Sequence, residues 1–186
     1  EIQSIHWIDN KLYAVFNTPS NSIHGSAICS FTTDSIDASF IGPFKVQKST
    51  DRLWEPVNER HDVFDCKAND SAVFNEDTRR LNPLNSIYQL MDQPVQASDT
   101  IPLVISKQDH FKFIAVDLIR TQHHDVVEVI FVATFDGKLL KYVRWPTLSE
   151  PCLVDELHLT QSNDDRILTM KLLKDTQSLY FGTDKQ

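Results

Sequence analysis

The chain alternates short apolar runs with polar segments, a pattern typical of a β-protein. Residues 12–16 and 27–31 are rich in the β-branched, aromatic and small apolar side chains that suit a buried, pleated surface. The residues between these runs are rich in Ser, Asn, Pro and Gly, which favour loops. We predict a β-hairpin with a long loop, followed by a short helix that Asp34 caps and that Gly42 and Pro43 end.

The middle of the chain loses this regularity. Residues 45–82 carry many charges and scattered apolar side chains with neither a strand period nor a helix period, so we predict an irregular insertion. Residues 83–91 suit a short helix, because Pro83 fits a first helical turn and the apolar residues after it form one stripe. Pro94 would end the segment.

From residue 101 onward the pattern is that of strands. We predict them at residues 101–105, 111–119, 126–134, 138–145, 154–159, 167–173 and 178–182. Asp136 and Gly137 provide the positive-φ positions of a tight hairpin turn. Gly182 is predicted at a second turn, and Gly25 also falls in a predicted loop.

An internal repeat indicates that these strands belong to a repeating structural unit. The run VIFVATFDGKLLKY at 129–142 is echoed about 50 residues later by SLYFGTDKQ, and less closely by LYAVFNT near the start. Each is an apolar strand that leads through a Thr into a turn. This period, with several short strands per unit, is typical of propeller blades, and about two and a half blades are present. A propeller hides its blade faces only when the ring closes, so we expect the folding unit to be longer.

Charge and cysteine content narrow the function. A formal net charge of −8 disfavours nucleic acid, sulfated glycans and anionic lipid as direct partners. We find no apolar run long enough to insert into a membrane and no signal segment at the start, and we expect a targeting segment upstream. The three cysteines, an odd number, cannot all pair internally, and their spacing fits no zinc motif.

Several stretches together resemble one family. The runs GSAICSF and GPFKVQ, FKFIAVDLI, EVIFVATFDGKLLKY and SLYFGTD resemble, in this order, the second half of a sema domain. This is the seven-bladed propeller of semaphorins, plexins and their relatives, and CLVDEL at 152–157 resembles class 5 semaphorins. The resemblance implies an all-β fold with a partly helical insertion, called the extrusion.

The same resemblance implies a division of the chain. Residues 1–33 would hold the end of blade 4 and the first strands of blade 5, and residues 34–96 would be the insertion. Residues 97–160 would complete blade 5 and form blade 6, and residues 161–186 would begin blade 7.

The resemblance implies an extracellular guidance ligand, secreted or membrane-anchored through other regions, that binds plexin-type receptors in axon guidance and cell migration. It also allows a homodimer through the sema domain, and leaves the receptor-binding residues unknown. Two alternatives are a receptor-type sema domain of a plexin relative, which the insertion disfavours, and a propeller enzyme.

The resemblance also implies roles for individual residues. Cys29 and Cys66 match family cysteines that form disulfides with partners upstream, and a bond between the two is the alternative. No partner can be named for Cys152. Asn69 begins the one glycosylation sequon, and its place in a polar insertion favours its use.

Catalytic, metal and cofactor chemistry find little support. Adjacent histidines on a strand point to opposite faces, so His123 and His124 suit a solvated loop better than a metal site. Asp117 is a lone charge in an apolar strand that would pair with Arg120 or cap a turn. No nucleophile motif or phosphate loop is present. We therefore expect no catalytic residue, no metal and no cofactor.

Overall fold

We describe the protein from a computed structural model, in which residues 1–41, 43–47, 51–57, 90–123, 125–159 and 166–184 are described. Most described elements are strands, and the predicted all-β class is confirmed. The elements are β1 (Ile2–Ile8), β2 (Lys11–Asn17), β3 (Ser26–Thr32), α1 (Thr33–Ile41), β4 (Phe44–Val46), β5 (Glu55–Val57), β6 (Leu90–Met91), β7 (Val104–Ser106), β8 (Phe111–Arg120), β9 (Val126–Thr134), β10 (Lys138–Arg144), β11 (Cys152–His158), β12 (Ile167–Leu173) and β13 (Ser178–Thr183).

The chain divides into two compact units. The first consists of Glu1–Thr33 together with Ala97–Gln186, and the second is Asp34–Gln96. The second unit covers the residues that the sequence analysis assigned to the insertion. The numbering of blades within a ring stays a prediction.

The first sheet of the larger unit has the strand order β1-β2-β3-β7, with all neighbours antiparallel. The predicted hairpin is confirmed, because Leu12 lies opposite Phe31 and Ala14 opposite Cys29. The fourth strand, β7, follows the second unit in the chain and begins at Val104, later than predicted. One blade-like sheet is therefore completed by a strand from beyond the insertion.

The second sheet has the order β11-β10-β9-β8, and β12 pairs with β13 in a third. The predicted turn between β9 and β10 is confirmed, with Gly137 at φ 80°. The turn predicted at Gly182 is wrong, because this residue lies within β13 opposite Thr169. A Cβ on Gly182 would lie 2.7 Å from Cγ2 of Thr169, so close packing rather than turn geometry favours glycine there.

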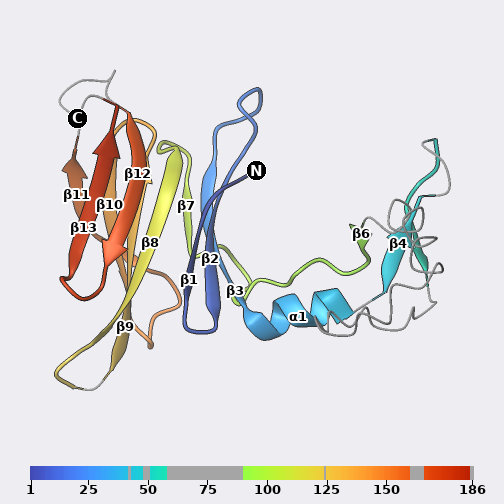
Figure 1. Cartoon of the computed structure of the whole chain (residues 1–186), viewed down its shortest axis with the longest axis horizontal. Helices are drawn as coiled ribbons and strands as arrows, with labels where there is room; N and C mark the ends of the chain where they lie inside the picture. Colours follow the sequence, from blue (N-terminus) through green and yellow to red (C-terminus); the bar gives the residue numbers. More distant parts are fainter. Residues whose placement is uncertain (42, 48–50, 58–89, 124, 160–165, 185–186) are drawn as a thin grey trace, which may run out of the picture. The chain divides into compact units, whose positions relative to one another are not determined.

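The core of the larger unit lies between the first and second sheets. β8 packs against β1 and β2 on one side and against β12 on the other, as Figure 1 shows for the neighbouring ribbons. The buried cluster is apolar and drawn from both sheets, and it includes Tyr13, Val15, Ile28, Ile114, Val116, Ile130, Val132 and Leu140. Successive antiparallel sheets stacked face to face are the arrangement of propeller blades, as predicted.

The smaller unit contains α1 and the sheet β5-β4-β6. The helix ends at Ile41 as predicted but begins at Thr33, so Asp34 lies in its first turn rather than at its cap. The Ser35 hydroxyl donates to the Gln96 carbonyl at 2.6 Å and ties the two ends of the unit together. The helix predicted at 83–91 is wrong at its end, because Leu90–Met91 pair with β4 as a strand; its other residues lie outside the described part.

Candidate functional site

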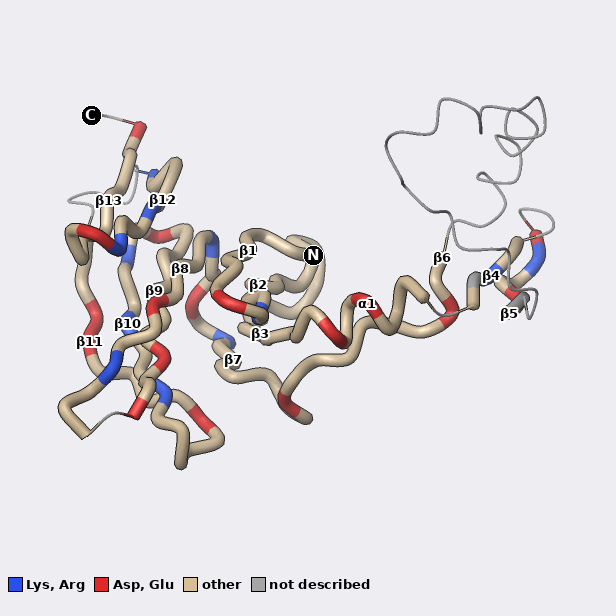
Figure 2. Tube along the Cα trace, turned by 60° about the horizontal axis from the view of Figure 1, so that its bottom comes forward, with Lys and Arg blue, Asp and Glu red and all other residues tan. Residues whose placement is uncertain are grey.

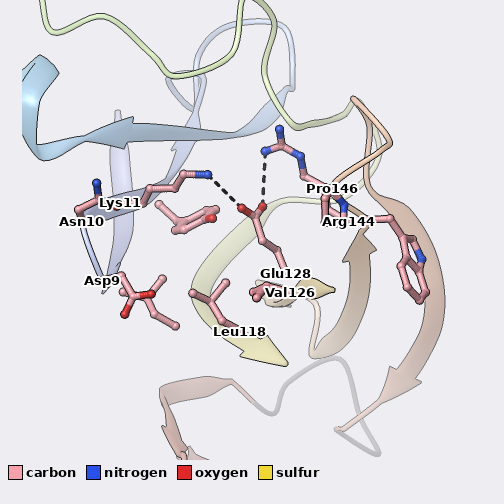
Figure 3. Close-up of a pocket in the computed structure, with 11 residues that line it drawn as sticks. Asp9, Asn10, Lys11, Leu118, Val126, Glu128, Arg144 and Pro146 are labelled. Carbon is pink, nitrogen blue, oxygen red and sulfur yellow. Dashed lines mark hydrogen bonds and ion pairs between the residues drawn. The ribbon is translucent and has the colours of Figure 1, made fainter. Parts of the chain in front are cut away.

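Three charged side chains meet between the first and second sheets, as Figure 3 shows. Lys11 of β2 contacts Oε1 of Glu128 on β9 at 3.1 Å, and Nη1 of Arg144 on β10 contacts Oε2 of Glu128 at 3.4 Å. The Glu128 carboxylate therefore bridges two cations that come from different sheets.

Arg144 extends this group to a segment that precedes β7. Its Nη2 lies 2.9 Å from Oδ1 of Asp99, and its Nη1 lies 3.3 Å from Oδ2. The buried Ser30 hydroxyl donates to Oδ2 of Asp99 at 3.3 Å. We call Lys11, Glu128, Arg144 and Asp99 the inter-sheet ion network. A network of alternating charges favours one arrangement of the two sheets more than it adds net stability.

A cavity of about 440 Å³ lies beside this network. Its lining is mixed and contains two acidic and two basic side chains among apolar ones: Ile8, Asp9, Asn10, Lys11, Tyr13, Leu118, Val126, Glu128, Arg144, Trp145 and Pro146. A lining of balanced charge suits polar side chains or water better than a strongly charged ligand.

Tyr13 contributes a buried polar group to the cavity. Its side chain is fully buried, and its hydroxyl makes no hydrogen bond of good geometry. Burial, and then the nearby Glu128 carboxylate, raise the pKa of Tyr13 far above its ordinary value. The hydroxyl stays protonated at physiological pH and cannot serve as a base.

The arrangement is suited to binding and positioning rather than to catalysis. The cavity lining has no Ser, Cys or His that could act as a nucleophile with a neighbouring base. Within the described residues no group of three His, Cys, Asp or Glu side chains is placed to hold a metal ion.

The predicted cysteines and sequon fall in different places. Cys29 is a half-buried free thiol in β3, and its pKa is raised by burial and then by Asp99. Cys152 is an exposed free thiol in β11. Cys66 and Asn69 lie outside the described residues, so the disulfide and glycosylation assignments stay predictions.

The other residues singled out from the sequence do not join the ion network. Asp117 is half-buried, and its Oδ1 accepts a hydrogen bond from the Leu118 backbone N–H at 2.9 Å. His123 is exposed in the turn after β8, and His124 lies outside the described residues.

Sequence reasoning missed the ion network, although a weak signal existed. Along each strand, Lys11, Glu128 and Arg144 have the same alternation as buried apolar residues, so each points toward the core side. A charge at such a position is a candidate for pairing. Glu128 and Arg144 lie opposite each other in the β9–β10 hairpin, so the register of that predicted hairpin could have paired them. Lys11 comes from another sheet, so local pattern could not identify it.

Comparison with known proteins identifies the family and supports a role in binding rather than in catalysis. The sema domain profile matches residues 2–174, and the chain belongs to the sema domain family. It is 35% identical over 189 residues to Semaphorin 5c of Drosophila melanogaster, covering 99% of this chain and 16% of that protein. It is 29% identical to human Semaphorin-5A, covering 98% of this chain and 17% of that protein. The predicted likeness to class 5 semaphorins is confirmed.

Solved structures agree. Drosophila Semaphorin 2a matches with a TM-score of 0.85 at 30% identity, covering 99% of this chain and 30% of that one. A chain in the structure of Drosophila Plexin A in complex with Semaphorin 1b matches with a TM-score of 0.76 at 27% identity, covering 99% of this chain and 39% of that one. Semaphorins are signalling proteins rather than enzymes, which agrees with the expectation of no catalytic activity.

Proposed function

We propose that this chain belongs to an extracellular guidance cue that acts by binding a plexin-family receptor. The observation that carries the proposal is the match, over 99% of this chain, to a chain in the structure of Drosophila Plexin A in complex with Semaphorin 1b. The chain spans only about a sixth of the curated relatives, so the contact residues can lie in it or elsewhere in the whole protein.

The surface chemistry fits a protein partner. In Figure 2, Lys and Arg positions on β8 to β12 are interspersed with Asp and Glu positions rather than gathered into one basic stretch. With a net charge of −8, the surface suits a partner that carries a basic patch. No helix in the described part of the chain has the length and apolar character needed to cross a bilayer.

Receptor binding can be tested directly on cells. The natural protein that contains this chain is applied, with a fluorescent label, to cells that express a plexin-family receptor and to matched cells that do not. We expect saturable labelling of the receptor-expressing cells only. Equal labelling of both, for every plexin class tested, would contradict the proposal. Light scattering on the same protein measures its mass in solution and so tests the homodimer that the family resemblance allows.

We also propose that Cys29 forms a disulfide with a cysteine of a neighbouring blade. Register puts Cys29 in one row with Ala14 and Ile5, on the sheet face opposite the core, and the Ile5 side chain is 59% exposed. An apolar face of this kind suits coverage by another sheet. Non-reducing peptide mapping of the natural protein tests the pairing, and a peptide linking Cys29 to Cys66 would support the alternative.

Asn69 is the proposed glycosylation site. Treatment with an amidase that removes N-linked glycans should lower the mass of the secreted protein, and Asn69→Gln should remove the part of that change owed to this site. An unchanged glycan mass in Asn69→Gln would exclude its use.

A further inference from the structure

Two histidines that are far apart in the sequence face each other at one end of the larger unit. His24 lies in the loop between β2 and β3, and His110 lies directly before β8. Nδ1 of His24 and Nε2 of His110 are in hydrogen-bond contact, and the ring centroids are 4.4 Å apart with planes tilted by 54°. The pair joins a loop of the first sheet to the start of the second.

Backbone contacts hold the loop that carries His24. The Thr18 N–H donates to the Gly25 carbonyl at 2.9 Å, and the Thr18 hydroxyl donates to the Ile23 carbonyl at 2.7 Å. The two acceptors, Ile23 and Gly25, flank His24, so these bonds restrict the backbone that carries its ring.

His110 is held from another direction. Its carbonyl accepts a hydrogen bond from the Phe135 N–H at 2.8 Å, and its ring meets the Phe135 ring edge to face at 6.2 Å. Both imidazoles therefore face each other from supported positions, which lowers the entropic cost of a shared ligand.

We propose that His24 and His110 form a two-histidine site for a divalent transition-metal ion, with Zn²⁺ as the probe. Two neutral imidazole nitrogens that face each other can share one proton, as their direct contact here allows, or both can donate lone pairs to a metal ion. The second arrangement requires the two rings to move apart, because each Zn–N bond is about 2.0–2.1 Å long. Imidazole suits Zn²⁺, Cu²⁺ and Ni²⁺ better than Mg²⁺ or Ca²⁺. Nδ1 of His24 and Nε2 of His110 are the ligating atoms.

The proposed site leaves coordination positions open, and a bound ion can exchange with solvent. Because no third protein ligand completes a group among the described residues, water fills the remaining coordination positions. His24 is exposed, so the ion can enter from solvent.

Calorimetric titration of the natural protein with Zn²⁺, after chelator treatment and dialysis at pH 7.4, tests the proposal. His24→Ala and His110→Ala should each weaken one binding event at least about tenfold, since loss of even an outer-shell partner costs that much. His123→Ala is the matched control, because His123 is exposed beyond the opposite end of β8, and it should leave this event unchanged.

A second variant separates metal binding from a simple hydrogen bond. His24→Asn keeps a side chain that can hydrogen-bond to His110 but replaces a good metal ligand with a poor one. It should lose the Zn²⁺-dependent rise in melting temperature while melting like the unmodified protein in chelator. If the unmodified protein binds no Zn²⁺, or if His24→Asn and His110→Ala bind it as tightly as the unmodified protein, the proposal is wrong.

Discussion

The Arg144 guanidinium holds the Asp99 carboxylate through both of its terminal nitrogens, at 2.9 and 3.3 Å, across 45 positions of sequence. Asp99 lies in the segment that returns from the insertion, and Arg144 ends β10 of the second sheet. This contact therefore fixes the returning segment against the second sheet, and Ser30 holds the same carboxylate from the first.

Replacing Arg144 by Met should destabilise the fold. The change leaves Asp99 and Glu128 without a shared cation in a site where the Glu128 side chain keeps 15% of its exposure. Because breaking a fully buried pair costs 3–5 kcal/mol and this one is partly hydrated, we expect a loss of about 2–3 kcal/mol in urea unfolding. Arg120→Met, at an exposed position, is the control, and a similar result for both variants would contradict the role given to the network.

Tyr13→Phe should change stability by less than about 0.5 kcal/mol, because the hydroxyl makes no hydrogen bond of good geometry and the nearby Glu128 carboxylate keeps its contacts with Lys11 and Arg144. Ser30→Ala is the comparison, since it removes a donor to Asp99 and should cost about 1 kcal/mol. Urea unfolding of both variants provides the measurement. A larger loss for Tyr13→Phe than for Ser30→Ala would mean that the hydroxyl has a partner in solution.

Gly182→Ala should destabilise the β12–β13 hairpin by about 1–2 kcal/mol, because the added methyl group would overlap Cγ2 of Thr169. Thr169→Ser removes that carbon, so the double variant should recover most of the loss. Thermal unfolding of the single and double variants measures the coupling. Additive losses in the double variant would show that backbone conformation, rather than this contact, favours glycine.

The first sheet should respond to mild acid through His6. Burial, and then the positive charge of Lys174, lower the pKa of His6 from its ordinary value of 6.5. Below pH 6.5 the unfolded chain binds the proton more readily than the folded chain, so stability present above that pH is lost as the pH falls through the lowered folded pKa. His6→Gln should reduce the loss of melting temperature between pH 7 and pH 5, while His123→Gln should follow the unmodified protein.

Local signals in the sequence were sufficient for most strands. The β9–β10 hairpin combines long apolar runs with an Asp136-Gly137 turn, so both its existence and its turn could be predicted. The turn predicted at Gly182 was wrong because a Gly-Thr-Asp run resembles a turn, whereas pairing of β13 with β12 determines the conformation of this residue. The helix predicted at Leu90–Met91 was wrong because these residues pair with β4 as a strand, although their apolar spacing also suits a helix.

The candidate sites were harder to predict, since their members meet only in the folded chain. His24 and His110 are 86 positions apart, and Lys11 and Glu128 are 117 apart. A single sequence gives residue types and local periods, but such contacts depend on how consecutive sheets stack. The family resemblance predicted how the sheets stack, but the individual side-chain partners could be identified only from the structure.

The most direct test of the central claim is the affinity of the natural protein for purified plexin ectodomains, measured by surface plasmon resonance in physiological salt. We predict saturable, reversible binding to at least one plexin class, with an unrelated β-propeller giving no signal. If no plexin ectodomain binds above that control while the protein is folded and monodisperse, this chain belongs to a sema domain protein with a different partner.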